Sequence, residues 1–150
     1  MNRPQREFVA MFRDRCNQRG LAYTHQRQVI YQALLGTRNH PTPEAIYERV
    51  RKHIPSISLG TVYKNIKTFI DAGLLREVTL HHGTLRVDAN LDAHHHLVCR
   101  VCRTIVDIGE HEIEPARLKG KLPTGFSVDR QTVEIIGTCA ACARGSRPRG

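Results

Sequence analysis

Two Cys-x-x-Cys pairs are the residues whose type and spacing most clearly suggest a chemistry. They are Cys99 with Cys102, in "CRVC", and Cys139 with Cys142, in "CAAC". Two such pairs supply a closed set of four thiolates, which suits a structural Zn²⁺. The N-terminal "MNRPQREF" is charged and shows no secretory signal, so we expect a cytoplasmic protein with reduced thiols. Zinc is therefore favoured over a redox pair or two disulfides.

A second group of candidates mixes imidazoles with carboxylates. Its members are spread along the chain: His40, Asp88, His94, His96 and Asp107. In a strand, His94 and His96 would share one face, while His95 would point the other way. Such a nitrogen and oxygen set suits Fe²⁺, Mn²⁺ or Zn²⁺. The alternative is that His40 is an ordinary histidine before a helix and that 94–96 is a polar edge strand.

The elements expected in the first half are helices followed by a hairpin. Helices are predicted over 4–20, 24–36, 42–54 and 58–73, with Thr24, Thr42 and Ser58 as N-caps and Gly73 as a stop. Residues 74–88 contain two β-type runs around a turn at 82–83. This order predicts a winged helix-turn-helix whose helix 58–72 enters the major groove. Cys16, on the apolar stripe of the first helix, is predicted to be a buried free thiol.

The second half is predicted to be a small α+β domain. Strands are expected over 95–100 and 104–109, a helix over 110–122, and a long strand over 126–139. If the long strand runs beside the first, both cysteine pairs meet at one sheet edge. Residues 144–150 are expected to be a disordered basic tail. The predicted domains are therefore 1–90, 91–143 and the tail 144–150.

Charge is unevenly distributed along the chain. Residues 1–90 carry 14 Lys and Arg against 7 acidic residues, a net +7, whereas residues 91–143 carry 6 against 7, a net −1. A basic helical half joined to a ligand-rich half indicates a polyanion-binding module attached to a sensor, although Arg-rich solvated helix faces would give the same sum. The longest apolar runs are too short for a membrane span.

Taken together, the stretches "SLGTVYKN", "HHHLVCRVC" and the closing "CAAC" resemble the ferric uptake regulator (Fur) superfamily of metal-dependent bacterial repressors. The resemblance implies a homodimer of two-domain chains, each with a winged helix, a dimerisation domain, a structural zinc and a regulatory Fe²⁺ or Mn²⁺ that bridges the domains. The zinc ligands would be Cys99, Cys102, Cys139 and Cys142, and the regulatory ligands His40, Asp88, His94, His96 and Asp107. The partner would be an A/T-rich inverted repeat of duplex DNA. Its candidate contacts are Ser58, Thr61, Tyr63, Lys64, Asn65 and Lys67, with Tyr63 at base edges.

Asp at both 88 and 107 is similar to the peroxide-responsive repressors (PerR), because iron-sensing members usually have Glu there. In that branch iron-bound peroxide chemistry oxidises a ligand histidine, corresponding to His40 or His94 here, and DNA is released. Iron sensing stays open as the alternative, and zinc sensing is disfavoured by Asp88 and Ala89. A non-haem iron enzyme and a metal buffer without DNA binding are the remaining classes. No role is assigned to His81, His82, His95 or His111.

Overall fold

A computed structural model describes residues 3–37, 40–78, 84–114, 120 and 122–145 of the chain. The chain forms two compact units, Met1–Leu91 and Asp92–Gly150. No helix in the described ranges is long and apolar enough to cross a membrane.

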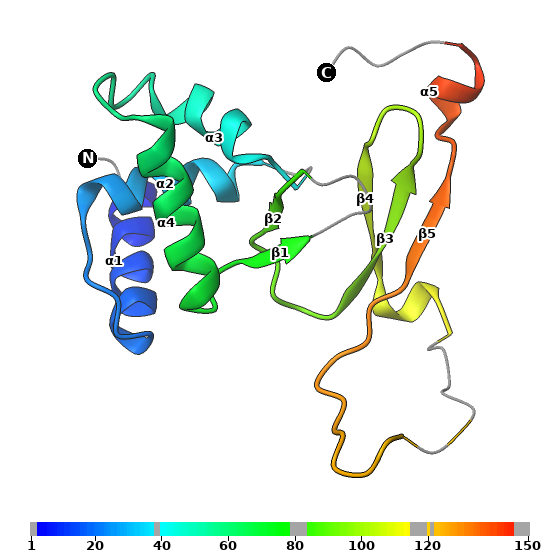
Figure 1. Ribbon diagram of the computed structural model, residues 1–150. Coiled ribbons are helices and arrows are strands. Elements are labelled where there is room, and N and C mark those ends of the chain that lie inside the picture. Colours follow the sequence, from blue (N-terminus) through cyan, green and yellow to red (C-terminus); the bar gives the residue numbers. More distant parts are fainter. Residues whose placement is uncertain (1–2, 38–39, 79–83, 115–119, 121, 146–150) are drawn as a thin grey trace. The chain divides into compact units, whose positions relative to one another are not determined.

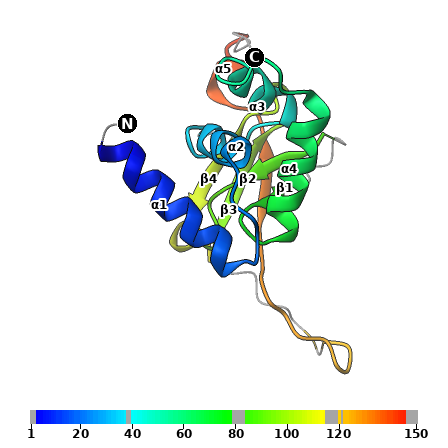
Figure 2. The ribbon, with the colours of Figure 1, turned by 90° about the vertical axis from the view of Figure 1, so that its left-hand side faces the viewer.

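The described residues of the first unit form four helices and a two-stranded sheet. They are α1 (Arg3–Gln18), α2 (His25–Leu35), α3 (Pro43–Val50), α4 (Leu59–Asp71), β1 (Arg76–Val78) and β2 (Arg86–Asp88). In both views, α2, α3 and α4 lie together (Figures 1 and 2). The strands β1 and β2 pair antiparallel, with Arg76 opposite Asp88. The predicted turn at 82–83 lies outside the described residues. Four helices followed by a hairpin confirm the winged-helix prediction.

Capping residues mark the ends of these helices. The hydroxyls of Thr24, Thr42 and Ser58 accept hydrogen bonds from backbone N–H groups of the following first turns, as predicted. Gly73 follows α4 with φ +68°, a conformation that costs glycine little. The third helix ends at Val50, four residues earlier than predicted. Pro55 lacks an N–H and disfavours helical geometry at the preceding residue, so only irregular turns continue.

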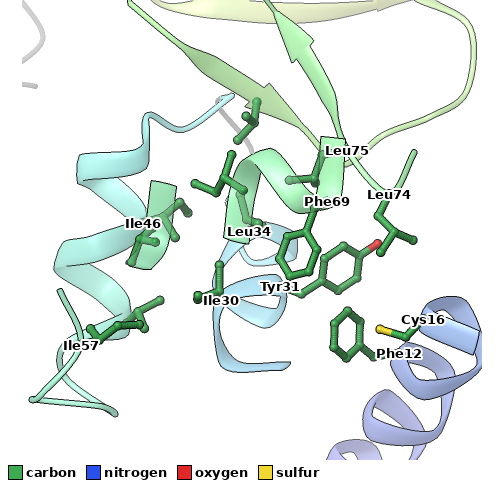
Figure 3. Close-up of a cluster of buried hydrophobic side chains, with 14 residues drawn as sticks. Phe12, Cys16, Ile30, Tyr31, Leu34, Ile46, Ile57, Phe69, Leu74 and Leu75 are labelled. Carbon is green, nitrogen blue, oxygen red and sulfur yellow. The ribbon is translucent and has the colours of Figure 1, made fainter. Parts of the chain in front are cut away.

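Aromatic side chains from three helices form the centre of the first core (Figure 3). The ring centroids of Phe12 and Tyr31 lie 4.8 Å apart, and Phe69 meets both rings edge-on. All three are fully buried. Cys16 is also buried in this cluster as a free thiol, which confirms its prediction.

The second unit is built on a three-stranded sheet in the order β4-β3-β5 (Figure 1). Its strands are β3 (His94–Cys99), β4 (Ile105–Gly109) and β5 (Glu134–Gly137), with a short 3-10 helix, η1 (Glu110–Glu112), and α5 (Ala140–Ala143). β4 is antiparallel to β3, and β5 is parallel to it. The predicted return of the last strand beside the first is therefore confirmed.

Two predicted elements of this unit were wrong in extent. The strand expected over 126–139 is formed only at 134–137. Its register puts Glu134 opposite His96, so residues before 132 would extend beyond the start of β3 and lack a hydrogen-bonding partner. The helix expected over 110–122 is limited to η1 among the described residues, and Ile113 is extended. Pro115 disfavours helical geometry at the residue before it.

Candidate metal centres and recognition helix

Four cysteine sulfurs gather at one end of the sheet in the second unit. Cys99 is the last residue of β3 and Cys139 follows β5, so the parallel pairing of these strands brings the two Cys-x-x-Cys turns together. All four Sγ atoms lie within 4.8 Å of one another, and none is in a disulfide. The Sγ atoms of Cys102 and Cys139 are 3.7 Å apart.

This spacing fits a tetrahedral zinc site. Zn–S bonds of about 2.3 Å in a tetrahedron require sulfurs about 3.8 Å apart. The 3.7 Å between Cys102 and Cys139 matches this distance, and no two of the four sulfurs are more than 4.8 Å apart. A set of four protein sulfurs leaves no open position, so the chemistry it suits is structural.

Hydrogen bonds prepare two of the thiols to ionise. The backbone N–H groups of Cys102 and Cys139 donate to Cys99 and lower the pKa of its thiol to about 6. Hydrogen bonding with the side chain and the backbone of Thr104 lowers the pKa of the Cys102 thiol. By contrast, desolvation and hydrogen bonds to neighbouring sulfurs raise the pKa of Cys142 to about 12. A metal ion that binds here would displace the protons from the thiols that are still protonated.

Two histidines and an aspartate meet on one face of the same sheet. His94 and His96 are two residues apart on β3, and Asp107 on β4 lies directly opposite His96. The Nε2 atoms of the two imidazoles are 3.1 Å apart. Asp107 Oδ1 lies 3.8 Å from the Nε2 of His94 and 3.7 Å from that of His96. Metal–ligand bonds of about 2.1 Å place neighbouring ligands about 3.0–3.4 Å apart, so the three atoms need little adjustment to face one ion.

The tautomer of His94 suits this role. Its Nδ1 lies 2.8 Å from the carbonyl oxygen of Asp92, which can only accept a hydrogen bond. The proton of the neutral ring is thus on Nδ1, and Nε2 carries a bare lone pair. This contact also fixes the orientation of the ring, as a hydrogen bond from the second ring nitrogen does for most metal-ligating histidines.

The remaining two candidates lie together in the first unit. His40 and Asp88 are both buried, with His40 Nδ1 3.8 Å from Asp88 Oδ2. The backbone N–H of Val87 donates to the carbonyl of Pro41, and the Arg86 guanidinium donates to the carbonyl of His40. These bonds attach the segment that precedes α3 to β2. Asp88 also accepts a hydrogen bond from the backbone of Asn90.

His95 lies on the opposite face of β3 and is buried rather than solvated. Its Nδ1 accepts a hydrogen bond of 3.1 Å from the backbone N–H of Val133. β3 lies between two partners, so the alternative of a polar edge strand does not hold. His111 is exposed in η1, and His81 and His82 lie outside the described residues.

The predicted DNA-contacting residues divide into two groups in α4. Tyr63, Lys64 and Lys67 are exposed, and Lys67 pairs with Asp71 at 3.6 Å. Ser58 is also exposed, but its side chain caps the helix and hydrogen-bonds to the Thr61 hydroxyl at 2.9 Å.

Asn65 is only 8% exposed. Its amide donates to the Thr61 carbonyl and its Oδ1 accepts from Arg27 on α2. The stripe of Val62, Ile66 and Phe69 on α4 could have indicated its burial from the sequence.

Sequence reasoning did not find the partner of Tyr63. The Tyr63 hydroxyl donates a hydrogen bond to Glu44 Oε1 at 2.5 Å. Glu44 lies in the first turn of α3, and a carboxylate at the positive end of the helix dipole needs no further partner to explain its residue type. The two residues are 19 apart in sequence, and no spacing rule connects them.

Comparison with known proteins agrees with this architecture. A sequence model of the ferric uptake regulator family matches residues 18–136. The chain is 33% identical over 123 residues to the peroxide-responsive repressor PerR of Staphylococcus epidermidis, covering 82% of each protein. It is 34% identical over 125 residues to PerR of Staphylococcus aureus, covering 83% of this chain and 84% of the relative.

Solved structures share the fold. A zinc-bound manganese uptake regulator superposes with a TM-score of 0.63 at 25% identity, over 85% of this chain and 97% of the other. The ferric uptake regulator Fur of Helicobacter pylori, described as having three functional metal binding sites, gives a TM-score of 0.70 at 19% identity, over 92% and 93%.

Proposed function

This chain belongs to the ferric uptake regulator family, whose members are metal-dependent regulators rather than enzymes, and we propose that it is a repressor that senses hydrogen peroxide through its regulatory metal. The observation that carries the proposal is the pair of His94 and His96 facing Asp107, in a chain related to named peroxide-responsive repressors.

We assign Zn²⁺ to the four cysteines as a structural ion. The second unit has a short sheet and a small buried core, so closure of its two Cys-x-x-Cys turns by a metal adds the stability that such a core lacks.

We assign the regulatory Fe²⁺ or Mn²⁺ to His40, Asp88, His94, His96 and Asp107 together. The second unit offers three of these ligands and the first offers two, whereas Fe²⁺ and Mn²⁺ bind five or six ligand atoms. One ion that takes ligands from both units favours the arrangement in which they meet. An ion that binds one arrangement more tightly shifts the population towards it, which is how metal binding would promote DNA binding.

A second copy of the chain is the partner we propose for the open face of the sheet. Val106, Leu97 and Ile135 lie opposite one another across β4, β3 and β5. They are 52%, 41% and 44% exposed, which is a large apolar exposure for a row at the middle of a sheet. Burial of this row between two chains gives a homodimer, whose two-fold symmetry matches an inverted repeat in DNA.

The DNA contacts that we propose lie on α4. Tyr63 would reach base edges in the major groove, and Lys64 and Lys67 would bind phosphates of an A/T-rich inverted repeat. The net +7 of residues 1–90 supports this assignment, because phosphate neutralisation supplies most of the non-specific affinity. Ser58, Thr61 and Asn65 act in support, by capping and bracing the helix.

For the peroxide response, bound Fe²⁺ would supply the redox chemistry that activates hydrogen peroxide next to an imidazole. The net reaction inserts one oxygen atom of the peroxide into the ring of His40 or His94 and releases the other as water. A ring oxidised in this way is a poorer ligand, so the ion is lost and the two units separate. The sensor is consumed, and no catalytic turnover follows.

The test treats the zinc-containing protein, loaded anaerobically with Fe²⁺, with a short pulse of hydrogen peroxide. Peptide mass spectrometry is expected to find one added oxygen on His40 or His94, in parallel with loss of binding to a selected operator. The Mn²⁺-loaded protein is the matched control, and exposed His111 is the internal one. Unmodified ligand histidines with retained DNA binding would assign the chain to iron sensing instead.

The variant Asp107→Glu sharpens this test. The family resemblance associates glutamate at this position with iron sensing, and we expect the longer carboxylate to keep metal-dependent DNA binding while slowing the histidine oxidation. Oxidation at the unchanged rate would show that Asp107 does not set the response.

A further inference from the structure

The hydrogen bond between Tyr63 and Glu44 joins the exposed face of α4 to the first turn of α3. Tyr63 is 38% exposed, so part of its side chain remains available to a ligand while its hydroxyl proton is engaged. Glu44 is held in place by its own helix, whose N-cap is Thr42 and whose first residue is Pro43. The carboxylate therefore sits at a defined position beside the residue that we expect to meet base edges.

A phenol has one proton to donate, and here it is donated to a carboxylate. An ionised carboxylate can only accept, so the direction of this bond is fixed. The bond to Tyr63 lowers the pKa of Glu44, and the bond to Glu44 raises the pKa of Tyr63. At neutral pH the phenol therefore donates and the carboxylate accepts, and the phenol oxygen can still accept a hydrogen bond.

We propose that Glu44 is a positioning residue that makes Tyr63 a hydrogen-bond acceptor, so that Tyr63 reads an amino group of the operator, on adenine N6 or cytosine N4. The major-groove edges of guanine and thymine offer acceptors at the corresponding places, and a phenol without a free proton gains nothing from them. This inference rests on the proposed function, because it requires α4 to lie in the major groove. It adds a specificity residue that lies outside the recognition helix.

Besides fixing the direction of the Tyr63 hydrogen bond, the Glu44 carboxylate has an electrostatic effect on DNA binding that must be separated from it. A negative charge near the DNA-binding face repels phosphates whatever the sequence, so its removal raises affinity for every duplex. Glu48 provides the control, since it lies one turn further along α3 and pairs with Arg51 at 3.2 Å. Glu48→Gln removes the same charge from the same helix without touching Tyr63.

The experiment uses the metal-loaded full-length protein and an operator selected by the wild type from random duplexes. Each amino group in a half-site is then deleted singly, by placing purine for adenine or 2-pyrimidinone for cytosine. In the wild type, one deletion is expected to weaken binding about five- to tenfold, the range of one hydrogen bond to a base. In Tyr63→Phe and in Glu44→Gln the same deletion should change affinity less than about twofold, because the amide of Gln no longer fixes the phenol's polarity.

Glu48→Gln is expected to keep the full wild-type sensitivity to that deletion. Retention of the sensitivity by Glu44→Gln, or its loss in Glu48→Gln, would overturn the inference while leaving the repressor assignment intact. Enrichment of no sequence by the wild type would overturn both.

A measurement without DNA tests the pair itself. The chain has four tyrosines, and the phenol that disappears from an ultraviolet titration in Tyr63→Phe is assigned to Tyr63. Its ionisation should occur at higher pH in the wild type than in Glu44→Gln, and Glu48→Gln should resemble the wild type. Equal midpoints in all three proteins would contradict the contact on which the inference depends.

Discussion

The Nε2 atoms of His94 and His96 lie 3.1 Å apart on one face of β3, with the carboxylate of Asp107 beside both. The two nitrogens are within hydrogen-bond distance, so neutral rings share one proton between them. A cation bound there would replace that proton, and each ring would then offer it a lone pair. The arrangement thus allows one ion to bind both imidazoles and the carboxylate.

Replacement of His96 by alanine is expected to remove the regulatory ion selectively. Loss of a ligand should weaken Mn²⁺ binding by ~100-fold or more, because removing a residue that merely orients a ligand already costs about tenfold to a hundredfold. Calorimetric titration with Mn²⁺ measures this directly, and the zinc content should stay unchanged. His111→Ala, which alters an exposed histidine, is the control. Normal Mn²⁺ affinity in His96→Ala would rule out the proposed ligand set.

The cysteine cluster makes a different prediction, of lost structure. In Cys102→Ser the hydroxyl is a poor replacement for a thiolate, so we expect the bound zinc to be lost and the second unit to unfold well below the wild-type temperature. Elemental analysis and circular dichroism measure the two effects. Cys16→Ser should retain zinc, since Cys16 is buried in the core of the first unit. Full zinc content in Cys102→Ser would contradict the four-sulfur site.

Some features of the fold and of the sites can be predicted from the sequence, and others cannot. Residue type predicted the caps at Thr24 and Thr42. The two-residue period of a strand predicted that His94 and His96 share a face that excludes His95. The extent of β5 depends on where its partner strand begins, which its own residues do not encode.

The contact between Glu44 and Tyr63 likewise depends on how two helices pack, so it became visible only in three dimensions. The burial of Asn65 could be predicted only in part, because the apolar stripe on α4 indicates it but the polar residue type argues against it.

Residues that stabilise α4 can be distinguished by measurement from residues that contact DNA. Asn65→Ala removes the acceptor of the Arg27 Nε–H in a partly buried place, while the guanidinium keeps its bond to the Ala22 carbonyl. Loss of that one bond should lower the free energy of unfolding by about 1 kcal/mol. Lys64→Ala alters an exposed residue and should leave that stability unchanged. It should instead weaken binding to every duplex and reduce the slope of log affinity against log salt by about 0.9 for each phosphate that the protein no longer neutralises. Chemical denaturation and salt-dependent anisotropy titrations separate the two variants, and the opposite pattern would exchange their roles.

The exposed row on the sheet leads to the final prediction. Leu97→Glu places a charge between Val106 and Ile135, at the centre of the apolar row. If two chains meet through this row, the charge would be buried without a partner. Because Leu97 is exposed within its own unit, the single chain should fold and keep its zinc, while the dimer dissociates at micromolar concentration. Light scattering on a sizing column measures the mass, and DNA affinity should fall with it, since one chain reaches only one half-site. Val128→Glu, at an equally exposed residue outside the sheet, should remain dimeric. A dimeric Leu97→Glu protein would mean that the two chains meet through another surface.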